Sequence, residues 1–338
     1  METADRTDEE VCTEALSAFG LPAPEEVRLI PEGLMNRNWS VRCAAGRYAL
    51  KEVVDVGPDQ ARRQHTATRA LARAGLLVPA PVTTTDGDTL AAVRGRLYAL
   101  TPWAAGEMVP ARSWRPDRAA AVGALLGELH SELAVAMPEA PATVPVIITA
   151  PKKAADRFAH YGRQAAAGES GFDATVERAL VERTELLERW ADQRPQDGER
   201  GPAGWTHGDF HDLNLLWEQG SVSAVLDWDR LAVRPYADEV VRTATLPVMF
   251  GSGDEHGLDL ELVAAFVGGY RKASELPAAV LAEAAERQRW ERICDVWQLK
   301  MHYDKGDESC DHLFTAASTL IGWWCRNRQQ VADALTAF

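Results

Sequence analysis

The segment from residue 205 to residue 229 contains three polar side chains whose types and spacing suit phosphoryl transfer, Asp209, Asn214 and Asp227. A carboxylate at position 209 can take a proton from a hydroxyl group. An amide oxygen and a second carboxylate can hold Mg²⁺ against the phosphates of a nucleotide. The pattern His-x-Asp-x4-Asn, followed by a strand that ends in Asp, is specific because three polar types must fall at fixed offsets around two apolar runs.

A predicted hairpin explains how these residues come together. Residues 215–217 read as a buried strand, residues 218–221 as a turn, and residues 222–226 as the returning strand. Asn214 would begin the first strand and Asp227 would end the second, so both would converge on one hard cation. We expect Asp227 to be the main Mg²⁺ ligand.

Two further residues of this segment have expected roles. Asp229 would lie on the same side of a strand-like stretch as Asp227, and we expect it to be an outer-shell or second-metal ligand. Asp209 lies in the preceding loop and would face the hydroxyl of the acceptor. His207 is expected to bond backbone groups and to brace this loop.

The segment resembles the catalytic loop of the aminoglycoside phosphotransferase and choline kinase family, a group of protein-kinase-like enzymes that act on small molecules. His207-Gly208-Asp209 and Asn214 match the loop, and Leu226-Asp227-Trp228-Asp229 matches the family's metal motif. Protein kinases usually carry Arg between the His and the Asp, and Phe-Gly after the metal-binding Asp. The residues at 208 and 228–229 therefore favour a small-molecule kinase.

The resemblance implies an α+β, bilobal protein-kinase-like fold. Residues 1–103 would form a small antiparallel-sheet N-lobe that binds ATP. Residues 104–338 would form a larger, mainly helical C-lobe with the catalytic loop, the metal site and the helices that bind the acceptor. The implied cofactors are ATP, with GTP as the alternative donor, and Mg²⁺.

The N-terminal region supplies what such a kinase still needs. Residues 28–30, 38–42 and 47–54 read as three antiparallel strands. Tyr48-Ala49-Leu50-Lys51 resembles the family's strand-three lysine motif, and an ammonium there can pair with the α- and β-phosphates. An ordinary edge-strand lysine is the alternative interpretation of Lys51.

The usual carboxylate partner of this lysine is absent from the expected place. In kinases it is a Glu on the next helix, predicted here at residues 60–74, and by register that position falls on Gln64. Either Lys51 relies on Gln64 or another residue is its partner. The phosphate loop is reduced, and Gly33 or the Asn36 amide is expected to approach the phosphates.

Residues 97–103 read as a strand that runs into the connector between the lobes. In the family the backbone of this connector bonds the adenine edge. Pro102 has no N–H group, so the adenine bonds would fall on neighbouring residues, Thr101 and Trp103. The Trp103 ring would stack on the nucleobase or pack in the core between the lobes.

Composition favours an ordinary soluble enzyme. The 338 residues are 46% hydrophobic and 25% charged, and the N-terminus is unlike a signal or transit peptide. No apolar run approaches the ~18 residues of a membrane span. Five scattered cysteines predict reduced thiols and a cytoplasmic address. The net charge of −14 argues against nucleic-acid binding and would suit a cationic substrate. A monomer and a homodimer both remain open.

The remainder of the chain is expected to be mostly helical. Residues 137–151 and 194–204 read as loops, and Asp238 as a helix cap. The predicted helices cover residues 117–133, 156–193, 259–272, 277–303 and 311–335. Trp290, Ile293, Trp297 and Met301 recur at helical spacing and mark an apolar face, which forms either core or the wall of an acceptor pocket.

Two alternatives from other classes remain. In a metallohydrolase, residues His207, Asp209, His211 and Asp212 would form a metal cluster, although this leaves Asn214 and Asp227 without a role. A degenerate kinase-like binding module would lack turnover. For a kinase, the acceptor is expected to be a small-molecule hydroxyl. It would belong either to an antibiotic-like natural product or to a metabolite such as homoserine, choline or an amino sugar.

Overall fold

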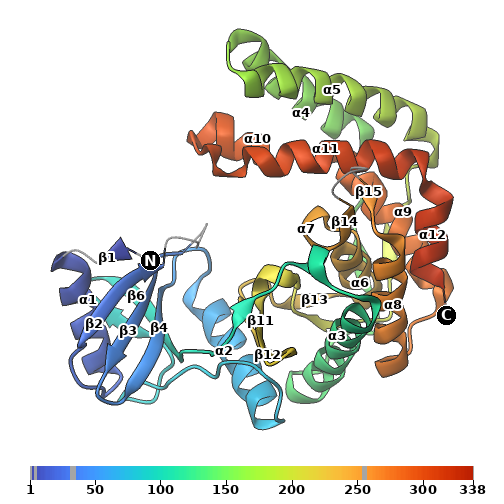
Figure 1. The fold of residues 1–338 in the computed structure, drawn as a ribbon. Coiled ribbons are helices and arrows are strands. Elements are labelled where there is room, and N and C mark those ends of the chain that lie inside the picture. The colour runs from blue at the N-terminus through green and yellow to red at the C-terminus, as the bar shows by residue number, and fades with distance from the viewer. Residues whose placement is uncertain (1, 4–5, 31–35, 253–256, 338) are drawn as a thin grey trace. The chain divides into compact units, whose positions relative to one another are not determined.

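The computed structural model describes residues 2–3, 6–30, 36–252 and 257–337, and it divides the chain into two units. Unit 1 comprises residues 1–109, 131–139 and 205–232, and unit 2 comprises residues 110–130, 140–204 and 233–338. Figure 1 shows the elements of both units, and each unit is described here by itself.

Unit 1 is built on a six-stranded antiparallel sheet with the order β1-β2-β3-β4-β6-β5. The three predicted N-terminal strands and the predicted strand before the connector are confirmed. The strands are β1 (Glu2–Thr3), β2 (Glu26–Ile30), β3 (Asn38–Cys43), β4 (Gly46–Glu52), β5 (Ala91–Val93) and β6 (Arg96–Pro102).

Two helices complete the N-terminal part of unit 1. Helix α1 (Arg6–Ala18) places Cys12, Ala15 and Leu16 in an apolar core with Trp39 of β3 and Leu50 of β4. These side chains leave water together, and burial of this kind is the main favourable contribution to folding. Helix α2 (Pro58–Arg73) confirms the helix predicted at 60–74, and it begins with a proline at its first position.

The predicted hairpin is present. Strand β11 (Leu215–Glu218) pairs with β12 (Ser221–Val225), and β7 (Glu107–Met108) pairs with the other edge of β11. Gln219 and Gly220 between the strands both have positive φ, as a two-residue type I′ loop requires. The loop fixes the register of the two residue pairs next to it, and the register then shifts by one residue between Trp217 and Leu216.

The hairpin belongs to unit 1, although the sequence-based division assigned everything after residue 103 to the second lobe. Two contacts explain this grouping. Strand β7 follows the connector directly and joins the hairpin, and the backbone N–H of Val225 donates to the Leu77 carbonyl just after α2.

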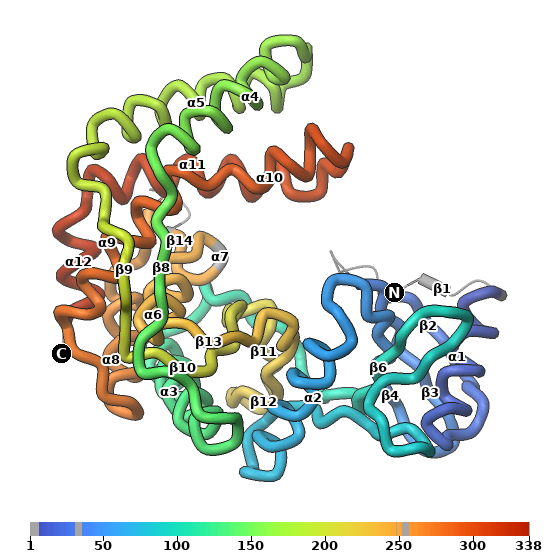
Figure 2. Tube along the Cα trace, turned by 180° about the vertical axis from the view of Figure 1, so that it is seen from behind, coloured from blue at the N-terminus to red at the C-terminus, as the bar shows by residue number. Residues whose placement is uncertain are grey.

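Unit 2 is mainly helical, as predicted. Helices α4 and α5 lie side by side in Figures 1 and 2, and a capping box formed by Ser170 and Asp173 starts α5. The helices are α3 (Pro116–Ala136), α4 (Pro151–Ala167), α5 (Gly171–Trp190), α6 (Tyr236–Ala244), α7 (Pro247–Phe250), α8 (Leu260–Ala273), α9 (Ala278–Cys294), α10 (Trp297–Leu299), α11 (Asp311–Arg326) and α12 (Arg328–Thr336).

Short strands lie within the two segments predicted as loops before α4 and after α5. Strand β8 (Val144–Val146) pairs with β9 (Gly198–Arg200), and Figure 2 shows the two segments running side by side. The other short strands are β10 (Ala203–Thr206), β13 (Ala232–Pro235), β14 (Gly251–Ser252) and β15 (Gly257–Leu258). Most residues of the two segments are loop, as predicted. The short strands within them were missed because strands of three or four residues are stabilised by distant partners and carry too few residues for a pattern.

The helix predicted at 277–303 is broken. Helix α9 ends at Cys294, and after Asp295 the chain continues as α10 and a π-helical turn (Lys300–Asp304). The break turns the predicted apolar face, so Trp290 is fully buried while Trp297 is 44% exposed. The Asp238 cap was also wrong, since Pro235 occupies the cap position and the Asp238 carboxylate accepts from Arg287 at 2.6 Å.

Helix α3 is long and apolar enough by composition to cross a membrane, although the sequence predicted no such span. Its packing is that of a core helix. Gly123 lies so close to α8 that an added Cβ would be 1.9 Å from the Phe266 carbonyl oxygen, and Gly269 of α8 is equally close to Ala120. Near its end, His130 is buried and bonds Glu239 at 2.7 Å and Tyr270 at 2.9 Å.

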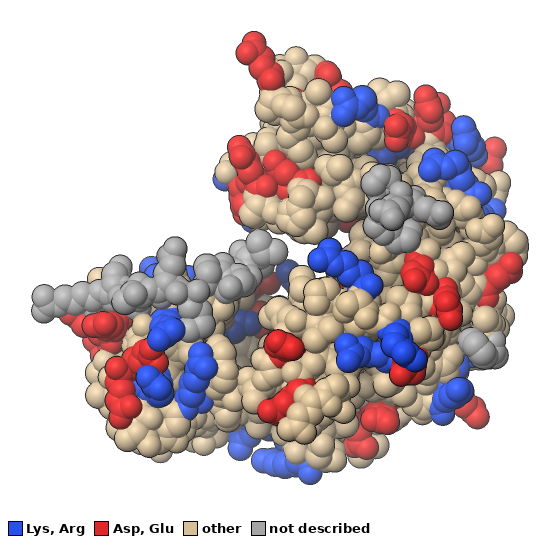
Figure 3. All heavy atoms as spheres, viewed as in Figure 1, with Lys and Arg blue, Asp and Glu red and all other residues tan. Residues whose placement is uncertain are grey.

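Charges of opposite sign lie next to each other over the sheet of unit 1, as Figure 3 shows on one face. Arg42 pairs with Glu26 at 2.8 Å, and Arg94 pairs with Glu10 and Glu14 at 3.1 and 2.6 Å. These exposed pairs contribute little to stability individually. They do show that the acidic excess of the chain is interspersed with arginine on this face.

Gly123→Ala is expected to destabilise the protein by about 3 kcal/mol, because the added methyl group forces α3 and α8 apart. Gly171→Ala is the matched control, since a Cβ at that position meets nothing within 4 Å. Chemical denaturation of both variants measures the difference. A Gly123→Ala variant as stable as the wild type would contradict the close approach of the two helices.

Candidate functional site

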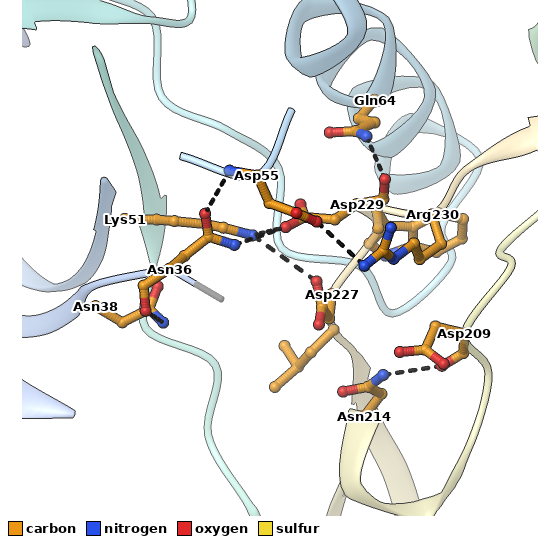
Figure 4. Close-up of polar contacts among 12 residues, drawn as sticks. Asn36, Asn38, Lys51, Asp55, Gln64, Asp209, Asn214, Asp227, Asp229 and Arg230 are labelled. Carbon is orange, nitrogen blue, oxygen red and sulfur yellow. Dashed lines mark hydrogen bonds and ion pairs between the residues drawn. The ribbon is translucent and has the colours of Figure 1, made fainter. Parts of the chain in front are cut away.

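Lys51 lies in unit 1 beside both carboxylates of the Asp-Trp-Asp motif. Its Nζ is 2.5 Å from Asp229 Oδ2 and 3.8 Å from Asp227 Oδ1 (Figure 4). The lysine lies on strand β4, and the two aspartates lie in the segment after β12. The structure thus brings three of the predicted site residues together across 178 positions of sequence, and Asp229 is the nearer partner of Lys51.

The Asn36 amide belongs to the same cluster. Its Nδ2 donates to Asp229 Oδ2 at 2.9 Å, and its Oδ1 accepts from the backbone N–H groups of Val54 and Asp55 at 3.1 and 3.4 Å. These bonds fix Asn36 to the segment that follows β4. Gly33, the other residue predicted in the phosphate loop, lies outside the described residues.

Gln64 does not bond Lys51. Its Nε2 donates instead to the backbone carbonyl of Asp229 at 2.8 Å, and Gln60 reaches the same oxygen at 3.4 Å. Of the two possibilities that the sequence left open for Lys51, the structure shows the second. A residue other than Gln64 is the partner, and α2 contacts that residue through its backbone.

His207 braces the catalytic loop, as the sequence predicted. Its Nε2 is 2.9 Å from the Leu226 carbonyl, and its Nδ1 accepts from the Asp209 backbone N–H at 3.2 Å. Because a backbone N–H can only donate, these partners assign the ring proton to Nε2. The ring is fully buried and contacts the rings of Trp228 and Phe210.

The loop turns at Gly208, whose φ of +86° is in the left-handed region that glycine adopts readily. It places Asp209 beside Asn214, which is buried in a short 3₁₀ turn (Asp212–Asn214). Asn214 Nδ2 donates to the Asp209 carbonyl oxygen at 2.9 Å. The backbone of Asp209 is therefore held on both sides, by His207 and by Asn214.

Asp227 and Asn214 are joined through the residue between the hairpin and the motif. The Leu226 N–H donates to the Asn214 carbonyl at 2.8 Å, and β12 ends at Val225. Asp227 then adopts a φ of +57°, so the predicted strand alternation of Asp227 and Asp229 does not apply. Backbone held in this region is often associated with a functional site.

The chemistry of these donors fits Mg²⁺. The Asn214 amide nitrogen is engaged with Asp209, which leaves the amide oxygen as the coordinating atom, and the Asp227 side chain is 47% exposed. Hard oxygen ligands of this kind are those that Mg²⁺ takes in nucleotide sites. The Asp229 side chain is only 17% exposed and is already paired with Lys51.

The connector residues Thr101 and Trp103 occupy the end of the sheet. Thr101 pairs with Ala49 of β4, and the Trp103 N–H donates to the Arg47 carbonyl at 2.9 Å. The Arg47 guanidinium carbon also lies 3.8 Å from the centre of a Trp103 ring. One face of the Trp103 ring and its backbone N–H therefore already have partners. Stacking of the ring on a nucleobase stays a prediction, and it would use the opposite ring face or require Arg47 to move away.

The metallohydrolase alternative loses its main ligand. Both nitrogens of His207 face backbone groups, so neither is directed at a metal. His211 Nε2 lies 3.2 Å from Asn214 Nδ2 and 3.6 Å from an Asp209 oxygen. Among the residues described, no three His, Cys, Asp or Glu side chains are gathered as a metal site.

Most candidate acceptor residues in unit 2 have internal partners. Trp290 of the predicted face is buried and belongs to the core, as does Trp324 of α11, whereas Trp297 of the predicted face is exposed. Two acidic residues that could bind an amine of the acceptor also have internal partners. Asp304 accepts from the Tyr161 hydroxyl at 3.2 Å, and Asp311 lies 3.0 Å from His302 Nδ1.

Two arginines of α9 that could pair with an acceptor carboxylate are engaged within unit 2, Arg289 and Arg292. Arg289 pairs with Glu286 at 2.8 Å and lies against the Trp190 ring. Arg292 donates to Thr245 Oγ1 at 3.1 Å, and burial lowers its pKa to about 10. Both therefore serve the helical core of unit 2.

Sequence reasoning missed three contacts of the site. It gave His211 a role only in the metallohydrolase, did not foresee that Asp229 pairs with Lys51, and did not consider the Asp55–Arg230 ion pair at 3.2 Å beside it. The sequence did offer one sign that Asp229 pairs with Lys51. Gln64 carries no charge, so the carboxylate that pairs with Lys51 had to come from another segment.

Comparison with known proteins agrees with this geometry. Residues 26–276 match the model of the phosphotransferase enzyme family, APH. A homoserine kinase from Janthinobacterium sp. (strain Marseille) is 30% identical over 117 residues. That match spans about a third of each protein, 34% of this chain and 35% of the relative.

Solved kinase structures share the fold over most of the chain. A spectinomycin phosphotransferase in complex with ADP and spectinomycin has a TM-score of 0.67 and 12% identity, covering 95% of this chain and 98% of that one. A microcompartment-associated aminopropanol kinase has a TM-score of 0.61 and 18% identity, covering 96% and 99%. An amicoumacin kinase has a TM-score of 0.60 and 16% identity, covering 91% and 90%. These similarities confirm the predicted fold class.

His65 on α2 makes the stability of the protein depend on pH. Burial lowers the pKa of His65 to about 4, with the Lys51 ammonium adding to the effect, and Nδ1 bonds Thr89 Oγ1 at 2.8 Å. The folded pKa lies below the unfolded value near 6.5, so the unfolded chain binds the extra proton and stability falls as the pH drops from 6.5 towards 4. At pH 5 the loss is about 2 kcal/mol.

Comparing the wild type with His65→Gln by denaturation at pH 7 and pH 5 isolates this contribution, because all other titratable groups are common to both proteins. The wild type should lose about 2 kcal/mol more than the variant over this interval. Equal losses would show that His65 is not held neutral by burial.

Proposed function

This chain belongs to the phosphotransferase enzyme family, and we propose that it transfers the γ-phosphoryl group of ATP to a hydroxyl group of a small molecule. The observation that carries the proposal is the convergence of Lys51, Asp227 and Asp229, together with Asp209 and Asn214 in the segment that precedes the hairpin. Positioning and electrostatic stabilisation account for most catalysis in phosphoryl transfer, and these five residues supply both.

Asp209 orients and deprotonates the acceptor hydroxyl in this proposal. Its backbone is fixed at the N–H by His207 and at the carbonyl by Asn214, so the point from which its side chain extends is fixed. General-base and positioning contributions of this type are worth about 10²-fold or more in rate. Lys51 contributes a positive charge that can pair with the nucleotide phosphates.

Mg²⁺ would be held by Asp227 and the Asn214 amide oxygen, and it would neutralise phosphate charge during transfer. Asp227 suits this role better than Asp229 because its carboxylate is the more exposed and is 3.8 Å from Lys51 rather than directly paired with it. GTP remains an alternative phosphoryl donor.

We propose an antibiotic-like natural product bearing an amine as the acceptor. Two structural relatives, the spectinomycin and amicoumacin kinases, support this choice, and each match covers at least nine tenths of both chains. The net charge of −14 favours a cationic acceptor. The engagement of Arg289 and Arg292 within unit 2 removes two candidate partners for a free carboxylate.

A metabolite of the homoserine, choline or amino-sugar type is the second candidate. It is favoured by the match to homoserine kinase and by the fold shared with an aminopropanol kinase. For either acceptor a cytoplasmic location is proposed, because all five cysteines are free thiols, four of them buried, and the reaction draws on ATP.

A nucleotide-consumption screen tests the function. Purified protein with ATP or GTP and Mg²⁺ is incubated with aminoglycosides, spectinomycin, nucleosides, amino sugars, choline and homoserine. Turnover on an amine-bearing antibiotic is expected. Turnover confined to homoserine or choline would replace the first acceptor class by the second, and binding of nucleotide with no turnover on any hydroxyl compound would favour a non-catalytic module.

Asp209→Asn is expected to lower the transfer rate by about 10²-fold or more while nucleotide binding is retained, because the amide cannot accept the hydroxyl proton. Glu218→Gln is the matched control, because Glu218 is an exposed carboxylate at the end of β11, in the hairpin that follows the Asp209 loop. Initial rates and nucleotide affinity of both variants are measured side by side. Near-wild-type transfer by Asp209→Asn would remove the base role from this residue.

A further inference from the structure

Lys51 needs a carboxylate partner, and helix α2 does not carry one that reaches it. A carboxylate on α2 would reach Lys51 from position 64, but this residue is the uncharged Gln64. Its Nε2 donates to the Asp229 backbone carbonyl at 2.8 Å. The side chain of the next acidic residue along the chain from Lys51, Glu52, is buried and pairs with Arg96 at 2.7 Å. The charge that holds Lys51 must therefore come from another element.

Asp229 has the geometry of that missing partner. Its Oδ2 lies 2.5 Å from Lys51 Nζ and also accepts from Asn36 Nδ2 at 2.9 Å. Its backbone carbonyl accepts from Gln64 on α2. Figure 4 shows the resulting chain of contacts, which runs from α2 through the backbone of Asp229 to its carboxylate and on to Lys51.

The burial of the two aspartates separates their roles. A side chain that is 17% exposed and shared between an ammonium and an amide is poorly placed to exchange its partners for a hydrated cation, whereas the Asp227 side chain is 47% exposed. Magnesium keeps several of its waters and requires access to them. The more exposed carboxylate therefore suits the metal, and the more buried one suits the lysine.

We infer that Asp229 is the positioning residue of Lys51, and that it supplies from the segment after β12 the carboxylate that α2 lacks. Gln64 keeps α2 in this arrangement by holding the Asp229 backbone. The position of the helix and the position of the lysine are thereby coupled through one residue of the loop. This inference rests on the proposed function, since it assigns Lys51 to the nucleotide phosphates.

The test is a double-mutant cycle on nucleotide binding without metal. The affinities of the full-length wild type, Lys51→Ala, Asp229→Asn and the double variant for ADP and GDP are measured by calorimetry in EDTA. Asp229→Asn should weaken binding by about tenfold in the wild-type background and leave it unchanged in the Lys51→Ala background. Asp55→Asn is the matched control, because its side chain pairs with Arg230, and its effect should be the same in both backgrounds.

Three results would overturn the inference. Equal effects of Asp229→Asn in both backgrounds would show that it does not act through Lys51. Tighter binding in both would show that the carboxylate only repels the phosphates. A larger increase in the Mg²⁺ concentration needed for half-maximal turnover in Asp229→Asn than in Asp227→Asn would make Asp229 a metal ligand. A wild-type chain that binds neither nucleotide would instead overturn the proposed function itself.

Discussion

The site depends on the backbone of Leu226, which joins the two halves of the catalytic segment. Its carbonyl accepts from His207, and its N–H donates to the Asn214 carbonyl. His207 in turn holds Asp209, and the residue after Leu226 is Asp227 with its left-handed backbone. The backbone of one residue thus links the expected base and both expected metal ligands. It can do so because β11 and β12 pair with a one-residue register shift between Leu216 and Trp217, after which Leu215 lies opposite Val225.

The second constraint is the charge of Lys51. An ammonium that is only partly exposed is stable when a carboxylate and a second polar group share its surroundings. Here the carboxylate is Asp229, which Asn36 also bonds, and the helix that faces it contributes an amide in place of an acid. The ion pair, Asn36 and α2 therefore form one connected network in unit 1, and His65 lies on the same helix.

In unit 2, buried charged side chains stabilise the helices. Arg183 donates to the carbonyls of Arg292, Ile293 and Asp295 at the end of α9, where these groups lack helical partners. Arg287 pairs with Asp238, whose pKa is raised by burial. Because these residues complete the helix termini and the core, their charge does not by itself identify an acceptor.

The sequence by itself determined the fold class and the extent of the principal strands, and it singled out Asp209, Asn214, Asp227 and Lys51 as candidate site residues. The motifs and the alternation of apolar residues are local properties, so they can be recognised without coordinates. Tertiary structure alone decided the partner of Lys51, since Asp229 reaches it across 178 positions and nothing in the sequence fixes that distance. It also decided the break after α9, which exposes Trp297, and the β8–β9 pair, because these depend on packing between distant segments that no local pattern encodes.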